Sequence, residues 1–223
     1  MLRDVVGKPL IIRTLERALQ AKSVTRTIVA TDSREIFDVI EAAGGTAVMT
    51  DERHRSGSDR IAEVAESLPA NAVVVNIQGD EPLISPETID RAVAAMLGDD
   101  RPDIVTAFEP ISSEAEFVDP NVVKLVMDQS GRALYFSRSP IPFRRNRGSS
   151  IAGLYKHCGL YVYRREYLLE FTKMPPTRLE EAEMLEQLRA LETGAFIKAV
   201  EAAGTSISVD TEQDLQRVCE ILG

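Results

Sequence analysis

The chain has 223 residues, of which 44% are hydrophobic and 27% charged, and this composition excludes a mainly disordered or low-complexity protein. The formal charge of −9, from 26 basic and 35 acidic residues, argues against nucleic acid as a partner. Apolar runs are far shorter than the ~20 residues that cross a bilayer, and the N-terminus has no signal-peptide pattern, so we expect a cytoplasmic protein with no membrane partner.

The first half of the chain predicts alternating helices and strands. Apolar residues with helical spacing are followed by short apolar runs that are typical of buried strands. In chain order the predicted elements are helix 10–21, strand 26–31, helix 36–43, strand 46–49, helix 60–68, strand 72–77, helix 86–97 and strand 104–108. This alternation predicts an α/β fold with a doubly wound, mostly parallel sheet.

The second half departs from that alternation. Segments 122–127 and 133–136 flank a turn at 128–131 and predict a hairpin, and a polar, basic loop follows at 144–150. The remaining predicted elements are strand 160–163, helix 167–171, helix 178–191, strands 197–200 and 206–209, and helix 212–222. We therefore expect one domain over residues 1–223, with a mixed sheet and a hairpin-bearing insertion around 122–163 that forms a sugar lid and a dimer interface.

Two aspartates lie just beyond the ends of predicted strands. Asp80 comes after the strand at 72–77, and Asp210 comes after the strand at 206–209. Ligands of doubly wound sheets bind beyond the carboxyl ends of the strands, and two carboxylates there could share a divalent cation such as Mg²⁺. The alternative is structural, because aspartate is common in turns and at helix N-caps. Spacing alone favours the structural interpretation.

The run NIQGDEPLI at residues 76–84 resembles the signature of the 3-deoxy-manno-octulosonate (KDO) cytidylyltransferase family. Other segments resemble the same family and occur in its order along essentially the whole chain. They are GKPLI at 7–11, HRSGSDR at 54–60, ALYFSRSPIP at 133–142, HCGLYVY at 157–163, MLEQLRAL at 184–191 and VDTEQDL at 209–215. The resemblance implies a fold like that of nucleotide-diphospho-sugar transferases.

The resemblance also implies a reaction and a set of site residues. The family transfers CMP from CTP to KDO for lipopolysaccharide biosynthesis, releases pyrophosphate, uses Mg²⁺ and forms homodimers. Asp80 and Asp210 become catalytic metal ligands. The positions that match the nucleotide site are Ser56, Gly57, Arg60 and Gln78, and those that match the sugar site are Arg138, His157, Tyr161, Glu183, Glu186 and Gln187.

Each of these positions also has a plain structural interpretation. The sequence SGSD at 56–59 is an ordinary helix cap, and Arg60 could be a solvated helix residue. His157 could be a hydrogen-bonded residue beside a strand, and Tyr161 could be half-buried packing. Glu183, Glu186 and Gln187 fall at helical spacing on one face, which is usually just a solvated face.

The sequence departs from the family at its start. The family begins with a strand and a phosphate-binding loop, and aligning on residues 7–11 leaves roughly 20 such residues unmatched. We therefore expect the chain as written to be inactive or nearly so, because the triphosphate lacks donors, and its sheet to be less stable and more prone to aggregation. A late-assigned start codon, a truncated chain and a shortened paralogue would each account for this. The functional alternatives are a cytidylyltransferase for a related acid, such as 8-amino-KDO or a nonulosonate, and a non-catalytic paralogue.

Overall fold

The computed structural model describes residues 1–146 and 150–223. The predicted basic loop at 144–150 therefore lies partly outside the described residues. Within them, no helix combines the length and apolar character needed to cross a membrane. Both cysteines are free thiols.

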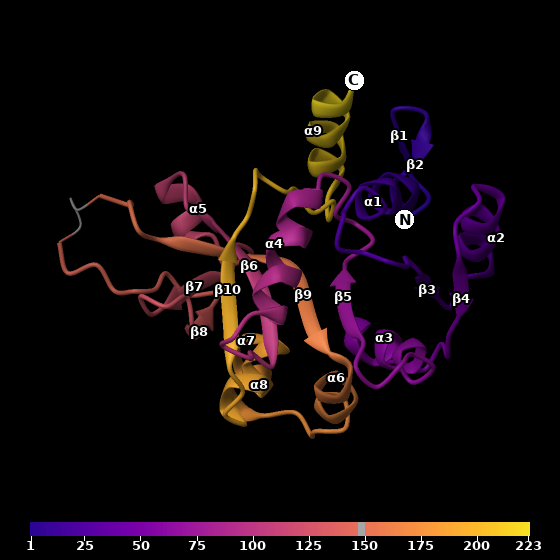
Figure 1. The fold of residues 1–223 in the computed structure, drawn as a ribbon. Coiled ribbons are helices and arrows are strands. Elements are labelled where there is room, and N and C mark those ends of the chain that lie inside the picture. Colours follow the sequence, from indigo (N-terminus) through magenta and orange to yellow (C-terminus); the bar gives the residue numbers. More distant parts are fainter. Residues whose placement is uncertain (147–149) are drawn as a thin grey trace.

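The centre of the molecule is a mixed sheet in the order β10-β6-β9-β7-β8, with β5 also paired to β9 (Figure 1). The strands are β1 (Asp4–Val5), β2 (Lys8–Pro9), β3 (Val29–Thr31), β4 (Ala47–Met49), β5 (Val73–Ile77), β6 (Ile104–Pro110), β7 (Lys124–Met127), β8 (Ala133–Ser137), β9 (Tyr155–Arg164) and β10 (Ile197–Glu201). Strand β9 runs antiparallel to β5, β6 and β7, whereas β10 pairs with β6 in parallel. The α/β class and the mixed sheet are confirmed. The expectation of a mostly parallel sheet is not met in its pairings, because β9 lies antiparallel between β5, β6 and β7 and only β10 pairs with β6 in parallel.

Helices cover both faces of this sheet. They are α1 (Leu10–Ala18), α2 (Arg34–Ala42), α3 (Gly57–Ala65), α4 (Pro86–Leu97), α5 (Glu114–Val118), α6 (Arg165–Phe171), α7 (Arg178–Glu183), α8 (Gln187–Glu192) and α9 (Glu212–Leu222). One apolar core joins α4 to β6 and β9 through residues such as Ile89, Met96 and Val162. A second core joins α3, α6 and α8 to the opposite face, through residues such as Ala65 and Leu188. These two cores hold the carboxyl end of β5 in a fixed place.

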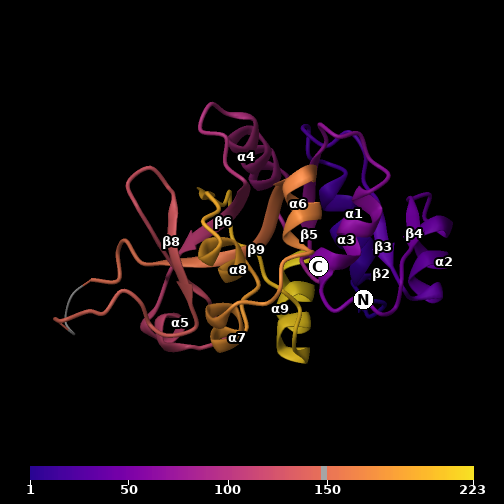
Figure 2. The ribbon, with the colours of Figure 1, turned by 90° about the horizontal axis from the view of Figure 1, so that it is seen from below.

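The predicted hairpin is present as β7 and β8, which pair antiparallel across the turn at 128–131. Together with α5 it projects to one side of the molecule, away from β3 and β4 (Figures 1 and 2). Strand β9 begins at Tyr155, five residues earlier than the predicted strand, because its first half pairs with β6 and β7. The hairpin is thereby joined directly to the central sheet.

Two predicted elements are wrong. The segment 206–209 is not a strand, because it lies against the loop after β5 rather than beside another strand, and its Val209 N–H donates to the Asp80 carbonyl at 2.9 Å. The predicted helix 178–191 is broken into α7 and α8 at Met184, whose φ is 53°. The Arg138 side chain donates to the carbonyls of Glu183 (2.8 Å) and Met184 (3.4 Å), and this pairing stabilises the end of α7.

Strands β3 and β4 form a separate, parallel two-stranded sheet. A cavity of about 770 Å³ lies between this sheet and β5. The carboxyl ends of β3 and β5 open onto the same region as the start of α3, and this region contains the predicted nucleotide residues.

Candidate functional site

The loop after β5 places Gln78 and Asp80 at the carboxyl end of a buried strand. The carbonyl of Gly79 accepts a hydrogen bond from the Thr14 hydroxyl at 2.8 Å, and the carbonyl of Gln78 accepts one from the N–H of Glu81 at 3.2 Å. The bond from Val209 to Asp80 brings the segment before α9 against this loop. Asp210 follows at once, so two carboxylates that are distant in sequence lie close together.

Asp80 is half-buried, and one oxygen of its carboxylate is fully buried. Its Oδ1 has no hydrogen-bond partner among the described residues, whereas Asp210 is exposed. Burial raises the pKa of Asp80, and the negative charge of Asp210 raises it further. A desolvated carboxylate beside a second one is stabilised by a divalent cation. Carboxylate oxygens are ligands that hard divalent cations prefer, so the chemistry of this pair fits such a cation.

A hydrogen-bonded set that the sequence reasoning missed holds this region together. The N–H of Ser206 donates to Glu109 at 2.9 Å, and the Ser206 hydroxyl donates to the Glu81 carboxylate. Burial raises the pKa of Glu81 to about 7. The available signal was that Glu81 and Glu109 lie within a few residues after two predicted buried strands, where a buried carboxylate needs hydrogen-bond partners.

The predicted nucleotide residues gather around the start of α3. Ser56 is its N-cap and accepts from the N–H of Asp59 at 3.1 Å. A Cβ atom on Gly57 would lie 3.6 Å from Nε2 of Gln78, an ordinary contact distance, so the start of α3 lies directly beside Gln78. Gly57, Arg60 and Gln78 all line the cavity.

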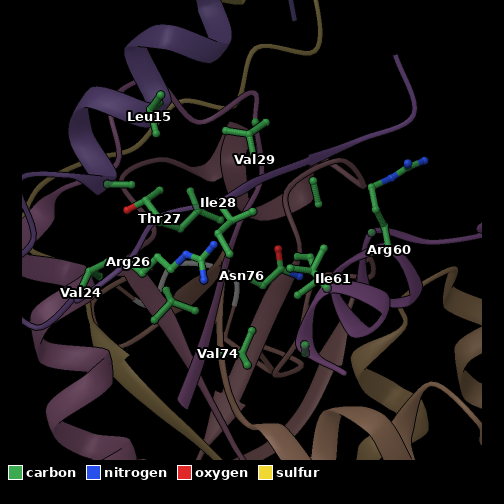
Figure 3. Close-up of a pocket in the computed structure, with 18 of the residues that line it drawn as sticks. Leu15, Val24, Arg26, Thr27, Ile28, Val29, Arg60, Ile61, Val74 and Asn76 are labelled. Carbon is green, nitrogen blue, oxygen red and sulfur yellow. The ribbon is translucent and has the colours of Figure 1, made fainter. Parts of the chain in front are cut away.

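Arg60 is held by groups of the chain itself. Its guanidinium donates to the Thr50 hydroxyl and to the Asp32 carboxylate, each at 2.6 Å, and it holds the pKa of Asp32 below its ordinary value. In Figure 3 it lies at the edge of the cavity, beside Ile61 of α3 and apart from Asn76 of β5. Arg60 therefore ties α3 to the ends of β3 and β4.

His157 and Tyr161 lie together on β9, with ring centroids 5.2 Å apart. The Nε2 atom of His157 is 2.8 Å from the Thr106 hydroxyl, and its ring meets Phe136 edge-on. Burial lowers the pKa of His157 to about 4, so the imidazole is neutral at neutral pH, and burial raises the pKa of Tyr161. Both side chains act as uncharged hydrogen-bonding groups.

Glu186 and Gln187 lie at the start of α8. Glu186 accepts a hydrogen bond from the Ser58 hydroxyl of α3 at 2.7 Å, while its other carboxylate oxygen is buried and has no hydrogen-bond partner in the described part of the chain. Gln187 is buried. The bond from Ser58 joins the predicted sugar residues to the helix that carries the predicted nucleotide residues.

Arg138 and Glu183 form a separate cluster. Glu183 accepts from the Ser137 hydroxyl at 2.6 Å and from the N–H of Arg138 at 2.9 Å. Besides the carbonyls of Glu183 and Met184, Arg138 also donates to the carbonyl of Pro120 at 3.1 Å. Because α7 ends at Glu183, this residue shares no continuous helix with Glu186 and Gln187, which corrects the single-helix expectation.

The comparisons with known proteins agree with this geometry. A family model described as Cytidylyltransferase matches residues 1–203. A solved structure of CMP:2-keto-3-deoxy-manno-octonic acid synthetase in complex with CTP superposes with a TM-score of 0.93 at 40% identity, covering 99% of this chain and 90% of that one. A 4-diphosphocytidyl-2C-methyl-D-erythritol synthase from Anaerococcus prevotii shares the fold at 14% identity, with a TM-score of 0.64 over 98% and 91% of the two chains. The fold and the site define a nucleotidyltransferase.

Two named relatives identify the family within the nucleotidyltransferases. The 3-deoxy-manno-octulosonate cytidylyltransferase of Geobacter sulfurreducens is 47% identical over 99% of this chain and 92% of its own length. That of Chlorobaculum tepidum is 46% identical over 98% of this chain and 88% of its own. The chain belongs to the 3-deoxy-manno-octulosonate cytidylyltransferase family.

Proposed function

We propose that this protein transfers the cytidylyl group of CTP to KDO, giving CMP-KDO and pyrophosphate. The observation that carries the proposal is the buried, unpartnered Oδ1 of Asp80 beside Asp210, at the strand end next to Gln78. Similarity to relatives that bear this enzyme's name supports KDO over the alternative acids and over a non-catalytic paralogue.

Asp80 and Asp210 are the groups that would hold Mg²⁺. The cation, when bound, offsets the charge that develops on phosphate during an in-line displacement. The loop that carries Asp80 is fixed by hydrogen bonds from the Thr14 hydroxyl to the Gly79 carbonyl and from the Val209 N–H to the Asp80 carbonyl, which orients the carboxylate in advance.

The nucleotide lies, in this proposal, between the start of α3 and the end of β5. Gly57 allows close approach of a ligand to the backbone, Gln78 offers an amide donor and acceptor, and Ser56 orders the first turn of the helix. Arg60 contributes positive charge at the edge of the cavity while it keeps its bonds to Asp32 and Thr50.

The sugar acid lies on the β9 side. Neutral His157 and Tyr161 can exchange hydrogen bonds with its hydroxyls, and Glu186 has one carboxylate oxygen free of hydrogen bonds for the same purpose. Gln187, Arg138 and Glu183 complete the proposed sugar side. The last two shape it by fixing the turn after α7. A homodimer that uses the hairpin-bearing insertion, and a cytoplasmic location, belong to the same proposal.

The test is pyrophosphate release from CTP, KDO and Mg²⁺. It is run on the 223-residue chain and on a version that carries the family's strand and phosphate-binding loop ahead of Met1. We expect release that depends on all three components and is faster in the extended version, which adds donors to the triphosphate. Replacing CTP by UTP, or KDO by N-acetylneuraminate, should reduce it strongly. Absence of release from both versions would refute the proposed function.

A further inference from the structure

The connection between β10 and α9 carries Asp210 and, along its whole described length, contains no strand. A strand is held by a ladder of backbone hydrogen bonds, whereas this connection is held by individual bonds to several elements. The N–H of Ala202 donates to the carbonyl of Phe108 in β6 at 2.9 Å, and the N–H of Ala203 donates to the Thr88 hydroxyl in α4 at 2.8 Å. The position of Asp210 therefore depends on particular contacts along the connection.

Ser206 in this connection bridges two buried carboxylates. Its N–H donates to Oε1 of Glu109 at 2.9 Å, and its hydroxyl donates to Oε2 of Glu81. Glu109 belongs to β6 and is 6% exposed, while Glu81 belongs to the loop after β5 and is 9% exposed. One small residue thereby ties the connection to the central sheet and to the loop that carries Asp80.

Glu109 is a fixed acceptor for this bridge. The ammonium of Lys156 on β9 lies 3.4 Å from its Oε2, and the thiol of Cys158 on the same strand donates to its Oε1 at 3.4 Å. A buried carboxylate needs such a cation and such donors to offset its loss of water. Because β9 supplies both, Glu109 stays in place and holds Ser206 by its N–H.

The bridge lies next to both proposed metal ligands. Glu81 directly follows Asp80 in the sequence, and Ser206 shortly precedes Asp210. A second bond, from the N–H of Val209 to the carbonyl of Asp80 at 2.9 Å, joins the same two segments. A segment held at two points has little freedom to pivot. The exposed Asp210 is thus kept near Asp80 by bonds of its neighbours.

We propose that Ser206 is a positioning residue that holds Asp210 where it can share a divalent cation with Asp80. This inference rests on the proposed function, which assigns the cation to the two aspartates. Without the Ser206 hydroxyl, only the bond of Val209 joins the two segments directly, and Asp210 samples more positions. The pair then binds the cation less tightly, because binding must first order the carboxylate.

The experiment uses Ser206→Ala, which removes the hydroxyl and keeps the N–H bond to Glu109. Ser206→Thr retains the hydroxyl, and Thr205→Ala alters an exposed neighbour in the same connection. The first readout is amide hydrogen exchange in protein free of metal and substrates. We expect exchange at Val209 to be about tenfold faster in Ser206→Ala and unchanged in the two controls. Exchange at Leu215, inside α9, should stay the same in all variants.

The second readout is the Mg²⁺ dependence of pyrophosphate release by the active enzyme. Loss of one hydrogen bond should raise the Mg²⁺ concentration at half-maximal rate about fivefold in Ser206→Ala. The kcat at saturating Mg²⁺ should change by less than about twofold, because the loaded site has the same ligands. Ser206→Thr should restore the original Mg²⁺ requirement, and Thr205→Ala should leave it unaltered.

Unchanged exchange at Val209 in Ser206→Ala would overturn the proposal, and so would faster exchange with the same Mg²⁺ requirement. Equal acceleration at Val209 and Leu215 would also overturn it, because Ser206 would then stabilise the whole fold. Absence of pyrophosphate release from the unsubstituted enzyme would refute the proposed function, whereas exchange at Val209 tests the positioning role by itself.

Discussion

Two polar regions carry predicted ligand residues, and they differ in how completely their atoms are hydrogen-bonded. In the turn after α7, Glu183 accepts from Ser137 and from Arg138, and the Arg138 guanidinium donates to three carbonyls. At the end of β5, by contrast, Asp80 keeps a buried oxygen without a partner. Buried polar atoms normally have hydrogen-bond partners. A buried carboxylate oxygen without one therefore indicates a place for a ligand, whereas a cluster in which every group is hydrogen-bonded indicates a structural role. The family resemblance assigned ligand residues to both regions, and only the pattern of hydrogen bonds distinguishes the candidate ligand site from the structural cluster.

The largest expected effect is that of Asp80→Asn. It keeps the shape of the side chain but removes its charge, so turnover of the active enzyme should fall about 10²-fold or more. The free energy of unfolding should stay level or rise, because the desolvated charge and its repulsion by Asp210 are removed. Steady-state kinetics at limiting Mg²⁺ and urea unfolding measure the two quantities. Asp99→Asn, at an exposed position outside the site, is the control. Near-normal turnover would contradict the assignment of Asp80 as a metal ligand.

Arg138→Ala tests the satisfied cluster. It leaves three carbonyls without their donor and should lower the free energy of unfolding by about 1–3 kcal/mol. Arg178→Ala, at an exposed position on α7, should have little effect. Urea denaturation compares the two variants. Unchanged stability together with a raised KM for KDO would instead make Arg138 a direct sugar ligand.

The pH dependence of stability is expected to follow Glu81. Because burial raises its folded-state pKa from 4.5 to about 7, the folded chain binds more protons than the unfolded chain between these values. Stability should therefore fall as pH rises across this window, by on the order of 1–3 kcal/mol. Unfolding in urea at pH 5 to 8, without divalent cations, measures the slope. Glu81→Gln should flatten it.

Glu116→Gln provides the control for that slope. Hydrogen bonds from Lys156 and Ser112 lower the pKa of Glu116 to about 2, against its burial. Its contribution to stability is lost only as pH falls below its ordinary value, so this variant should leave the slope between pH 5 and 8 unchanged. A slope that survives Glu81→Gln would assign the titration to another group.

His157→Ala is expected to have the smallest effect. Loss of one neutral hydrogen-bonding group should raise KM for KDO about fivefold and leave KM for CTP nearly unchanged. Because the pKa of His157 is about 4, the ratio should not vary between pH 6 and 8. Initial rates with each substrate varied in turn measure both constants. His54→Ala, which removes the other histidine, is the matched control. Equal effects on both substrates would contradict the assignment of β9 to the sugar.

Most elements with a strong periodic signal were predictable from the sequence. Helix α4 has its predicted limits, and β5 and the β7–β8 hairpin differ from prediction by one or two residues at their ends. These elements form through local spacing of apolar residues and through turn-forming residues, which the sequence shows directly.

The errors arise where distant residues decide the local structure. The break at Met184 depends on Arg138, and the irregular course of 206–209 depends on contacts with Glu81, Glu109 and the Asp80 carbonyl. Neither set of partners lies within the window that a periodicity argument covers. For the site, spacing placed both aspartates after strands, while the oxygen left without a partner could be found only in three dimensions.

The backbone bond between Val209 and Asp80 has a consequence for biosynthesis. Asp80 leaves the ribosome early, within a segment that can already pack against α3 and α4, whereas Asp210 is translated after β10. Chains fold progressively as they emerge, so the proposed acidic pair is assembled in one of the last steps. An unfinished chain then contains most of the sheet but lacks the second carboxylate of the proposed pair, so the proposed metal site can form only after residue 210 has been synthesised.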